Sequence, residues 1–411
     1  MQKDLKKRLK KEGESKTMLK EKKLTRVEIN LDAIAYNVKK ICDKVGPGVK
    51  VMAVVKADGY GHGAVEVAKV ALKNGAIYLA VGEVEEGVKL RLAGIKAPIL
   101  VLGPALPENA EDILKYDLTQ TVCTKELAQA LSFKAQEFKK EAKVHVKIDT
   151  GLGRIGVFPG EACRFIKNIL DFKGIKIEGI FTHLAEANKE DKSFSIEQIE
   201  KFKKVIFELE EEGIKIPLKH VANSAAVLDL PFSHFNMVRP GIIIYGLYPS
   251  KSMSPRQEFK PAMSFKTSIV YIKKVPAGTY LSYERSFITK KKSTIAILPV
   301  GYADGFSRAL SNRGEVLIKG KRAPVVGRVC MDMTLVDVSH IQEVKVGDEV
   351  VLFGRQSGEF ISVDEVASKA GTINYEVICT VGSKVPRVYL GKEKKEPSKN
   401  LPERVLSENI P

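Results

Sequence analysis

Eight short apolar runs alternate with amphipathic helical stretches between residues 50 and 242, and this alternation constrains the fold more than any other feature of the chain. Each run is rich in strand-forming residues and ends in small or polar ones. The runs cover residues 50–57, 76–82, 97–103, 118–123, 142–149, 175–183, 218–223 and 235–242. Eight strands alternating with helices over about 200 residues predict a parallel (β/α)₈ barrel of the TIM type, with a doubly wound open sheet as the weaker alternative.

Two of the expected helices carry signals at their ends. After the sixth run, Ser195 and Gln198 have the spacing of a capping box, and Gly213 is typical of a helix end. Later in the chain, Ser362 and Glu365 have the same capping-box spacing. We therefore expect one helix to begin at each serine.

The alternation of strand-like and helical segments stops after residue 250. Strand-like segments follow one another through turns that contain glycine and proline, and one helix is evident, at 362–372. This pattern predicts a mostly β second domain. The expected organisation is a basic arm at 1–23, a barrel domain at 24–250, a mostly β domain at 251–390 and a polar tail at 391–411.

Charge and cysteine content argue against several classes of protein. The formal net charge is +17, but residues 1–23 hold ten Lys or Arg and four acidic residues, so +6 of the excess lies in one arm. Such an arm is usually solvated, and without an RNA-binding motif we expect no nucleic-acid partner. No apolar run reaches the roughly 18 residues that span a bilayer. The five dispersed cysteines favour a reducing, cytoplasmic location and argue against a structural metal site.

Polar side chains at the strand ends are the first candidates for chemistry, because barrels of this kind carry their catalytic residues at the carboxyl ends of the strands. Seven such residues stand at or near the ends of the runs: Lys56, Lys147, Arg154, His183, Asn223, Ser224 and Arg239.

Lys56 is the candidate for covalent chemistry. Partial desolvation at a strand end lowers the pKa of a lysine and frees its amine to react with an aldehyde, such as that of pyridoxal 5'-phosphate. This cofactor also needs a phosphate site, which barrels commonly place in the loops after strands 7 and 8. Those loops offer the hydroxyl of Ser224 and the backbone amides of Gly241 and Ile242, and Tyr60 lies four residues after Lys56.

Seven motifs follow one another along the chain: AVVKADGYGHG, KIDTGLGRIG, VRPGIIIYG, SYERSF, GYADG, VCMDM and INYEVIC. In this order and spacing they resemble the motifs of the bacterial alanine racemases, pyridoxal-phosphate enzymes built from a barrel and a C-terminal β domain. The resemblance runs from about Val27 to Tyr389. It implies a homodimer with active sites shared between subunits, which interconverts L-alanine and D-alanine and supplies D-alanine for peptidoglycan.

The resemblance also implies a role for each matching residue. Lys56 would hold the cofactor and act as one catalytic base, and Tyr283 of the partner subunit would be the second base. Arg154 and the backbone of Met331 would bind the substrate carboxylate, and Lys147 matches a position that is carbamylated in many members. The other implied cofactor-binding residues are Tyr60, His183, Asn223, Ser224, Gly241, Ile242, Tyr375 and, at the pyridine nitrogen, Arg239. The other implied substrate-binding residues are Asp332 and Tyr302.

Some positions depart from the family pattern, and two related functions stay open. Glu284 stands where glycine is usual, and a carboxylate beside Tyr283 disfavours the phenolate that a tyrosine base must form. Met333 stands where glutamine is usual. The alternatives are a fold-related amino-acid decarboxylase and a pyridoxal-phosphate-binding homeostasis protein. The decarboxylases use an acidic partner where this chain has Arg239, and the homeostasis protein lacks a second domain.

Overall fold

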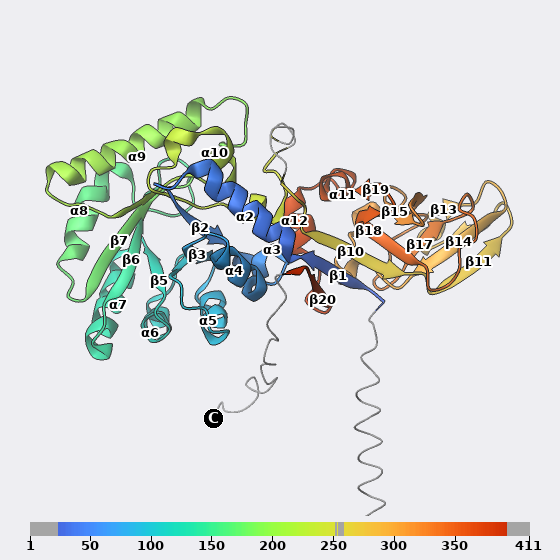
Figure 1. Cartoon of the computed structure of the whole chain (residues 1–411), viewed down its shortest axis with the longest axis horizontal. Helices are drawn as coiled ribbons and strands as arrows, with labels where there is room; N and C mark the ends of the chain where they lie inside the picture. The colour runs from blue at the N-terminus through green and yellow to red at the C-terminus, as the bar shows by residue number, and fades with distance from the viewer. Residues whose placement is uncertain (1–23, 251–252, 254–258, 393–411) are drawn as a thin grey trace, which may run out of the picture. The chain divides into compact units, whose positions relative to one another are not determined.

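The computed structural model describes residues 24–250, 253 and 259–392 of the chain (Figure 1). The predicted arm at 1–23 and residues 393–411 of the predicted tail lie outside the described residues. Packing divides the chain into two compact units. Within the described residues, one unit comprises Ile29–Met263 and 389–392, and the other comprises 24–28 and Ser264–Val388.

The first unit is a closed barrel of eight parallel strands, as predicted. Each strand lies within one of the eight apolar runs. In barrel order they are β2 (Lys50–Val54), β3 (Tyr78–Val81), β4 (Ile99–Val101), β5 (Thr119–Val122), β6 (Ala142–Lys147), β7 (Ile175–Phe181), β8 (Leu218–His220) and β9 (Met237–Val238). The barrel closes where Lys50 and Val51 of β2 pair with Met237 and Val238 of β9.

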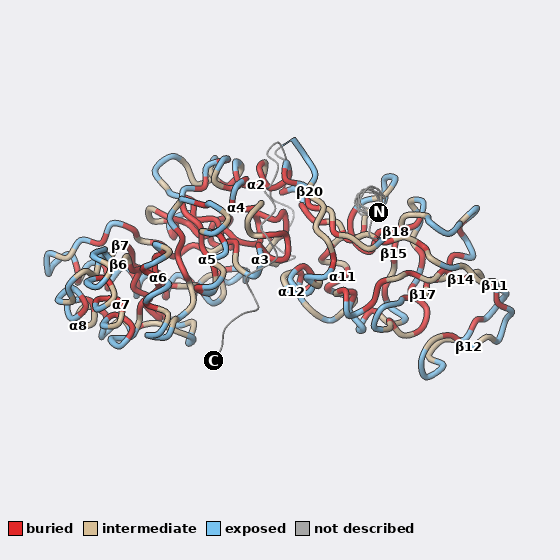
Figure 2. Tube along the Cα trace, turned by 90° about the horizontal axis from the view of Figure 1, so that it is seen from below, coloured by how far each residue is buried: buried red, intermediate tan, exposed pale blue. Residues whose placement is uncertain are grey.

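Helices connect the strands and cover the barrel, and Figure 1 shows α5 to α8 outside the strands β5 to β7. They are α2 (Leu31–Val45), α3 (Lys56–Tyr60), α4 (Ala64–Lys73), α5 (Val84–Leu92), α6 (Ala110–Lys115), α7 (Lys125–Phe138), α8 (Pro159–Leu170), α9 (Ser193–Glu211) and α10 (Ser224–Asp229). Every residue of β3, β4 and β5 is buried, because parallel strands are covered on both faces (Figure 2).

The predicted start of α9 at Ser195 is wrong. The helix begins at Ser193, so Ser195 lies inside it, fully buried, and Gln198 is one turn further along. The Gln198 amide instead donates to the carbonyl of His183 at 3.2 Å and accepts from the N–H of Ala185 at 2.9 Å. Gln198 thus fastens the loop after β7, a tertiary contact that sequence spacing does not reveal.

The second unit is mostly β, as predicted. Its largest sheet has the order β16-β15-β18-β10-β1-β20, with β19 paired to β18. The strand β1 (Arg26–Asn30) lies between β10 and β20 in this sheet, so the chain joins the second unit before it enters the barrel. The other elements are β10 (Met263–Ser268), β11 (Tyr271–Val275), β12 (Tyr280–Leu281), β13 (Phe287–Ile288), β14 (Ser293–Leu298), β15 (Glu315–Ile318), β16 (Lys321–Pro324), β17 (Thr334–Asp337), β18 (Glu349–Gln356), β19 (Glu359–Ile361), β20 (Arg387–Leu390), α11 (Val363–Ala370) and α12 (Asn374–Cys379).

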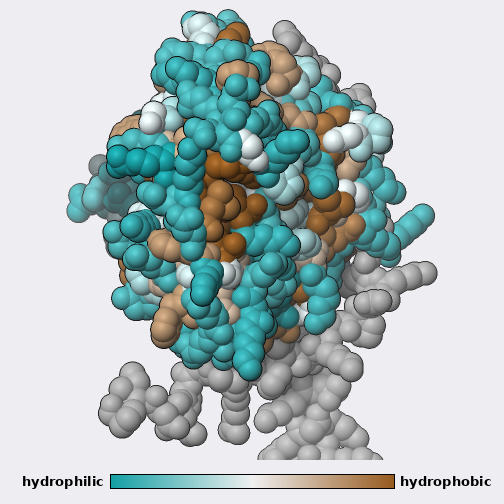
Figure 3. Space-filling model, turned by 90° about the vertical axis from the view of Figure 1, so that its left-hand side faces the viewer, coloured by the Kyte–Doolittle hydropathy of each residue, from teal (hydrophilic) through white to brown (hydrophobic). Residues whose placement is uncertain are grey.

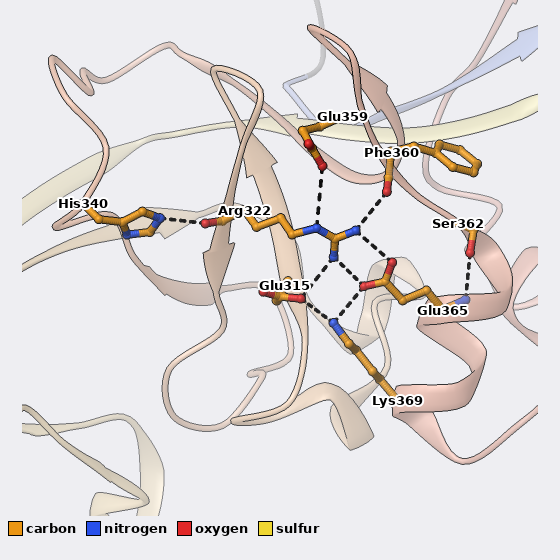
Figure 4. Close-up of polar contacts among 8 residues, drawn as sticks. All are labelled: Glu315, Arg322, His340, Glu359, Phe360, Ser362, Glu365 and Lys369. Carbon is orange, nitrogen blue, oxygen red and sulfur yellow. Dashed lines mark hydrogen bonds and ion pairs between the residues drawn. The ribbon is translucent and has the colours of Figure 1, made fainter.

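An ion-pair network fastens α11 to the strands β15 and β16 (Figure 4). Ser362 caps the helix as predicted, since its hydroxyl accepts from the N–H of Glu365 at 3.0 Å. The Glu365 carboxylate points to Arg322, with two contacts of 2.6 and 3.1 Å. Lys369 bridges Glu365 at 2.8 Å and Glu315 at 2.5 Å. Hydrogen bonds from these cations lower the pKa of both carboxyls below the ordinary value.

We expect Glu365→Gln to lower the free energy of unfolding by about 1 kcal/mol at neutral pH. A carboxyl whose pKa is depressed on folding stabilises the fold above its unfolded pKa, and this stability is lost as the pH falls through the folded pKa. The difference between variant and parent should therefore shrink in acid. Urea unfolding at neutral and acidic pH measures it. Glu359→Gln is the control, because Glu359 contacts Arg322 only at 3.8 Å; an equal loss in the control would contradict the network.

Candidate active site

Lys56 lies two residues after the end of the first barrel strand, β2, and begins a left-handed turn. Ala57, Asp58, Gly59 and Tyr60 all have φ between 50° and 63°. This conformation costs a non-glycine residue roughly 1–2 kcal/mol, so the surrounding contacts must enforce it. The carboxylate of Asp58 accepts from the N–H of Ala64 at 2.9 Å, which ties the turn to the start of α4.

Glu86 is a residue that the sequence analysis missed, and it holds the backbone on both sides of Lys56. Its two carboxylate oxygens accept from the N–H groups of Ala57 at 2.5 Å and Gly82 at 2.7 Å. A Cβ at position 82 would lie 3.2 Å from the Glu86 carboxylate and in ordinary contact with Lys56, so glycine there leaves room for Glu86. Glu86 lies in the first turn of α5, where nothing in sequence spacing links it to β2.

A cradle with the chemistry of a phosphate site lies after β8 and β9. The Ser224 hydroxyl accepts from the N–H of Gly241 at 2.8 Å. A Cβ at position 241 would lie 2.6 Å from the Tyr60 hydroxyl, so only glycine keeps this space open. The N–H of Ile242 begins the helix η3 (Ile242–Tyr245), where no earlier turn supplies an acceptor. Hydroxyls and backbone amides of this kind fit a phosphate group.

Asn223 also has a structural role that was not predicted. Its side-chain oxygen accepts from the N–H of Ala226 at 3.1 Å, so it is the N-cap of α10. This cap orients the helix that carries Ser224.

The guanidinium of Arg239 is buried among carbonyl groups and imidazoles. Nη1 donates to Nδ1 and to the backbone oxygen of His220, each at 2.8 Å. Nη2 donates to the carbonyls of Thr182 at 2.8 Å and Val221 at 3.0 Å, and Nδ1 of His183 lies at 3.4 Å. Among the described residues, no acceptor contacts Nε. Burial lowers the pKa of Arg239 to about 9, which leaves it cationic at neutral pH. A cationic donor without a protein acceptor fits an unprotonated ring nitrogen.

Two histidines beside Arg239 are held neutral. Burial, followed by the positive charge of Arg239, lowers the pKa of His183 and of His220 well below the ordinary value. The ring of Phe181 stacks on His220 with centroids 4.7 Å apart. His220 was not among the predicted site residues, although it ends the strand β8.

Lys147 ends the strand β6 and is almost fully buried. Its ammonium nitrogen lies 4.7 Å from the centre of the Phe181 ring. Burial, and then the charges of Arg239 and Arg154, lower the pKa of Lys147 well below its ordinary value. Lys147 therefore loses its proton more readily than an ordinary lysine, which favours nucleophilic chemistry of its amine in the barrel interior.

Asp149 shapes the loop that carries Arg154. Its carboxylate accepts from the N–H groups of Gly151 at 3.0 Å, Gly153 at 3.1 Å and Arg154 at 3.2 Å. Burial raises the pKa of Asp149, but these backbone bonds outweigh it and bring the pKa below the ordinary value. Arg154 itself is exposed in the described chain and available to an anion.

A separate cavity of about 420 Å³ lies between this loop and the helices α8 and α9. Figure 3, which views that side of the molecule, shows hydrophobic side chains gathered between hydrophilic ones. Phe158, Pro159 and Val205 contribute to the lining. No predicted site residue lines this cavity, so the cluster at the strand ends is the candidate active site.

In the second unit, Tyr283 lies in a strained turn. It begins the short helix η5 (Tyr283–Arg285), and its side chain is 70% exposed. Ser282, Glu284 and Arg285 have positive φ values of 64°, 59° and 52°, although none of them is glycine. Such outliers concentrate at functional sites. The Ser282 hydroxyl donates to the carbonyl of Arg328 at 3.0 Å and fixes the turn.

The Glu284 carboxylate is paired with Arg328. Two contacts of 2.6 and 3.2 Å join them, and this pairing lowers the pKa of Glu284. From the sequence, we expect the negative charge of Glu284 to act on Tyr283. The structure adds a cation that offsets this charge.

The remaining candidates of the second unit lie on two adjoining loops and one helix. The N–H of Tyr302 donates to the carbonyl of Cys330 at 3.1 Å, which brings the Tyr302 loop beside exposed Met331. Asp332 lies 3.5 Å from Lys384. Tyr375 lies on α12, where burial raises its pKa.

The sequence predicted neither a structural metal site nor a membrane-spanning segment. Within residues 24–250, 253 and 259–392, no three His, Cys, Asp or Glu side chains form a group that could hold a metal ion. In the same ranges, no helix combines the length and the apolar character that crossing a bilayer requires.

Two family models match the chain. The model described as alanine racemase, N-terminal domain, matches residues 29–249, and the model described as alanine racemase, C-terminal domain, matches residues 262–389. The alanine racemase of Halothermothrix orenii is 49% identical over 374 residues, which cover 90% of this chain and 99% of that protein. The alanine racemase of Desulforamulus reducens is 51% identical over 366 residues, which cover 89% of this chain and 98% of that protein.

Solved structures give the same result. Alanine racemase from Clostridium difficile 630 has a TM-score of 0.87 at 43% identity and covers 91% of this chain and 98% of its own. Alanine racemase from Bacillus anthracis with bound L-Ala-P has a TM-score of 0.85 at 40% identity and covers 90% of this chain and 96% of its own.

Proposed function

The chain belongs to the alanine racemase family, and we propose that it interconverts L-alanine and D-alanine with pyridoxal 5'-phosphate and two bases, Lys56 and Tyr283 of the partner subunit. One observation carries the proposal. Arg239 is buried at the strand ends with its η nitrogens bonded to protein acceptors, and among the described residues no acceptor contacts Nε. A fixed positive charge at this place suits a racemase better than a decarboxylase, which uses an acidic partner.

The barrel residues fit the cofactor part by part. Lys56 would bond to its aldehyde carbon, and Arg239 would donate to its ring nitrogen. Its phosphate would be held by hydroxyls and backbone N–H groups, those of Tyr60, Ser224, Gly241 and Ile242. The bound cofactor withdraws electrons from the α-carbon of the amino acid and so acidifies the α-proton.

Inversion at the α-carbon requires a base on each face, since one base that returned its own proton would usually restore the same hand. The amine of Lys56 would serve one face and the hydroxyl of Tyr283 the other. Because Tyr283 belongs to the second unit, we propose a homodimer in which each tyrosine serves the barrel of the partner subunit.

Arg154 would bind the substrate carboxylate together with the backbone of Met331. We propose that Lys147 is carbamylated: its neutral amine adds CO₂ and releases a proton, and the product is negatively charged. Its lowered pKa supplies the unprotonated amine that this reaction needs. The carbamate would pair with Arg154 and orient it. Asp332, Tyr302 and Tyr375 would complete the substrate pocket.

The family resemblance alone supports two further parts of the proposal. D-alanine made by this enzyme would supply peptidoglycan synthesis, and the reaction would take place in the cytoplasm.

We expect the purified, cofactor-loaded protein to convert L-alanine to a racemic mixture, measured by chiral chromatography. Borohydride should fix the cofactor to the peptide that contains Lys56, because the reduced bond resists hydrolysis. Release of CO₂ from an amino acid would support a decarboxylase, and cofactor binding without turnover would support a homeostasis protein. A label on the peptide of Lys147 would contradict the assignment of Lys56.

A further inference from the structure

A row of buried imidazoles continues inward from Arg239. Nη1 of Arg239 lies 2.8 Å from Nδ1 of His220, and Nε2 of His220 lies 2.8 Å from Nδ1 of His145. Both histidine side chains have 0% exposure. No part of the proposed reaction uses His145, so its burial at this position requires another explanation.

The donors and acceptors in this row have only one consistent arrangement. A guanidinium nitrogen can only donate, so Nδ1 of His220 must be the bare, accepting nitrogen. The proton of neutral His220 then sits on Nε2 and is donated to Nδ1 of His145. The proton of His145 must therefore sit on its own Nε2, and that atom has no hydrogen-bond partner among the described residues.

The barrel wall is shaped to hold the His145 ring. In the pairing of β6 with β7, His145 lies opposite Gly179, next to a shift of register at Val144. A Cβ at position 179 would come within 2.6 Å of the imidazole, so glycine is required there. The ring of Tyr78 packs against the imidazole with centroids 5.8 Å apart.

Placing an imidazole with an unpartnered N–H in an apolar interior is costly, and an apolar side chain would avoid that cost. What His145 supplies that an apolar residue cannot is an acceptor for His220. The row is also electrically neutral beyond Arg239, since burial, followed by the charge of Arg239, lowers the pKa of His145 to about 3.

We propose that His145 is a positioning residue: by accepting the Nε2 proton of His220, it orients the imidazole whose Nδ1 holds Arg239. Without that acceptor, the N–H at Nε2 of His220 would be buried without a partner, and the imidazole gains by turning toward another acceptor. Arg239 would then lose one of the bonds that aim its Nε. The consequence for the reaction rests on the proposed function of Arg239, whereas the hydrogen bond between the two histidines does not.

The test is ¹⁵N NMR of the holoenzyme labelled in its six histidines, combined with the partition between racemisation and transamination. In the parent, His220 should show a bare Nδ1 and a protonated Nε2 at neutral pH. His145→Phe keeps a ring of similar size but removes the acceptor, so the ¹⁵N shift of His220 Nδ1 should move toward that of a bare nitrogen without a hydrogen bond, because the ring no longer holds Arg239. Racemisation should fall about tenfold, the equivalent of one buried hydrogen bond, and pyruvate formed per turnover should rise.

Two further variants separate positioning from packing. His145→Gln restores an acceptor oxygen and should recover the parental Nδ1 shift and partition. Tyr78→Phe removes a hydroxyl that bonds Thr119 at 2.7 Å and disturbs the other side of the same ring, so it should change neither readout.

Each outcome bears on the proposal. A parental His220 that carries its proton on Nδ1 overturns it without any variant, even if His145→Phe does not fold. An unchanged Nδ1 shift and partition in folded His145→Phe also overturn it. Absence of racemisation in the parent would refute the proposed function and leave the NMR result on His220 standing.

Discussion

Tyr283→Phe should lower racemisation about a thousandfold, because the second catalytic base is lost and general acid–base catalysis contributes 10²- to 10⁴-fold. The loss should be unequal between the two directions of proton exchange. Lys56 would still remove the α-proton of one alanine enantiomer, so exchange of that proton into deuterated water should persist. Exchange from the other enantiomer should nearly stop.

The environment of Tyr283 makes phenylalanine a clean substitution. The side chain is 70% exposed, so the hydroxyl is not needed for packing within the described unit. The strained turn is held by Ser282 and by the pair of Glu284 with Arg328, which the variant leaves intact. The change therefore removes one reactive group and keeps the backbone that presents it.

Proton exchange followed by NMR, separately for each enantiomer, measures the effect. Tyr271→Phe is the matched control, since Tyr271 is a 58% exposed tyrosine of the same unit outside the proposed site. Equal losses for both enantiomers in Tyr283→Phe would show that Tyr283 is not a base specific to one face.

The barrel could be predicted because an apolar run occurs eight times in alternation with amphipathic stretches, and each run can be recognised from neighbouring residues alone. The strand-end rule then pointed to Lys56, Lys147 and Arg239, which the structure indeed places at or next to strands of one barrel. The conformation of the turn after Lys56 could not be predicted from the motif AVVKADGYGHG. Its left-handed conformation depends on Glu86, which bonds Ala57 from a distant helix.

The failures share one physical cause, namely that a polar side chain has several possible partners and spacing along the chain reveals only the local ones. Gln198 has capping-box spacing to Ser195, yet it bonds the loop after β7. The bond by which Asn223 caps α10 was likewise not predicted. His220 ends the strand β8, and its sequence neighbours give no sign of Arg239, 19 residues later in the sequence.

Glu284 is a further case in which the sequence shows a charged residue but not its partner. Sequence alone identified an unusual carboxylate next to Tyr283 but not the cation that accompanies it. Its partner Arg328 lies 44 residues later in the chain. The charge acting on the Tyr283 hydroxyl is therefore that of an ion pair rather than that of an isolated carboxylate.

Arg239→Glu should lower racemisation by two or more orders of magnitude, roughly 3 kcal/mol of barrier, and raise the fraction of turnovers that end in pyruvate. A guanidinium keeps a positive charge against the ring nitrogen and disfavours a second proton there. A carboxylate reverses that effect, so negative charge from the α-carbon spreads further into the ring. Reprotonation at the cofactor carbon, rather than at the α-carbon, then becomes more frequent.

Arg239 also donates to the carbonyls of Thr182, His220 and Val221, and glutamate would leave these acceptors without donors. Loss of racemisation alone could therefore reflect a displaced backbone. Arg239→Lys separates the two causes, because it keeps the positive charge but loses the planar fork. We expect it to slow racemisation without raising the pyruvate fraction, as measured by coupled assay on cofactor-loaded protein. If the pyruvate fraction rises equally in both variants, or in neither, the charge of Arg239 does not control the fate of the reaction.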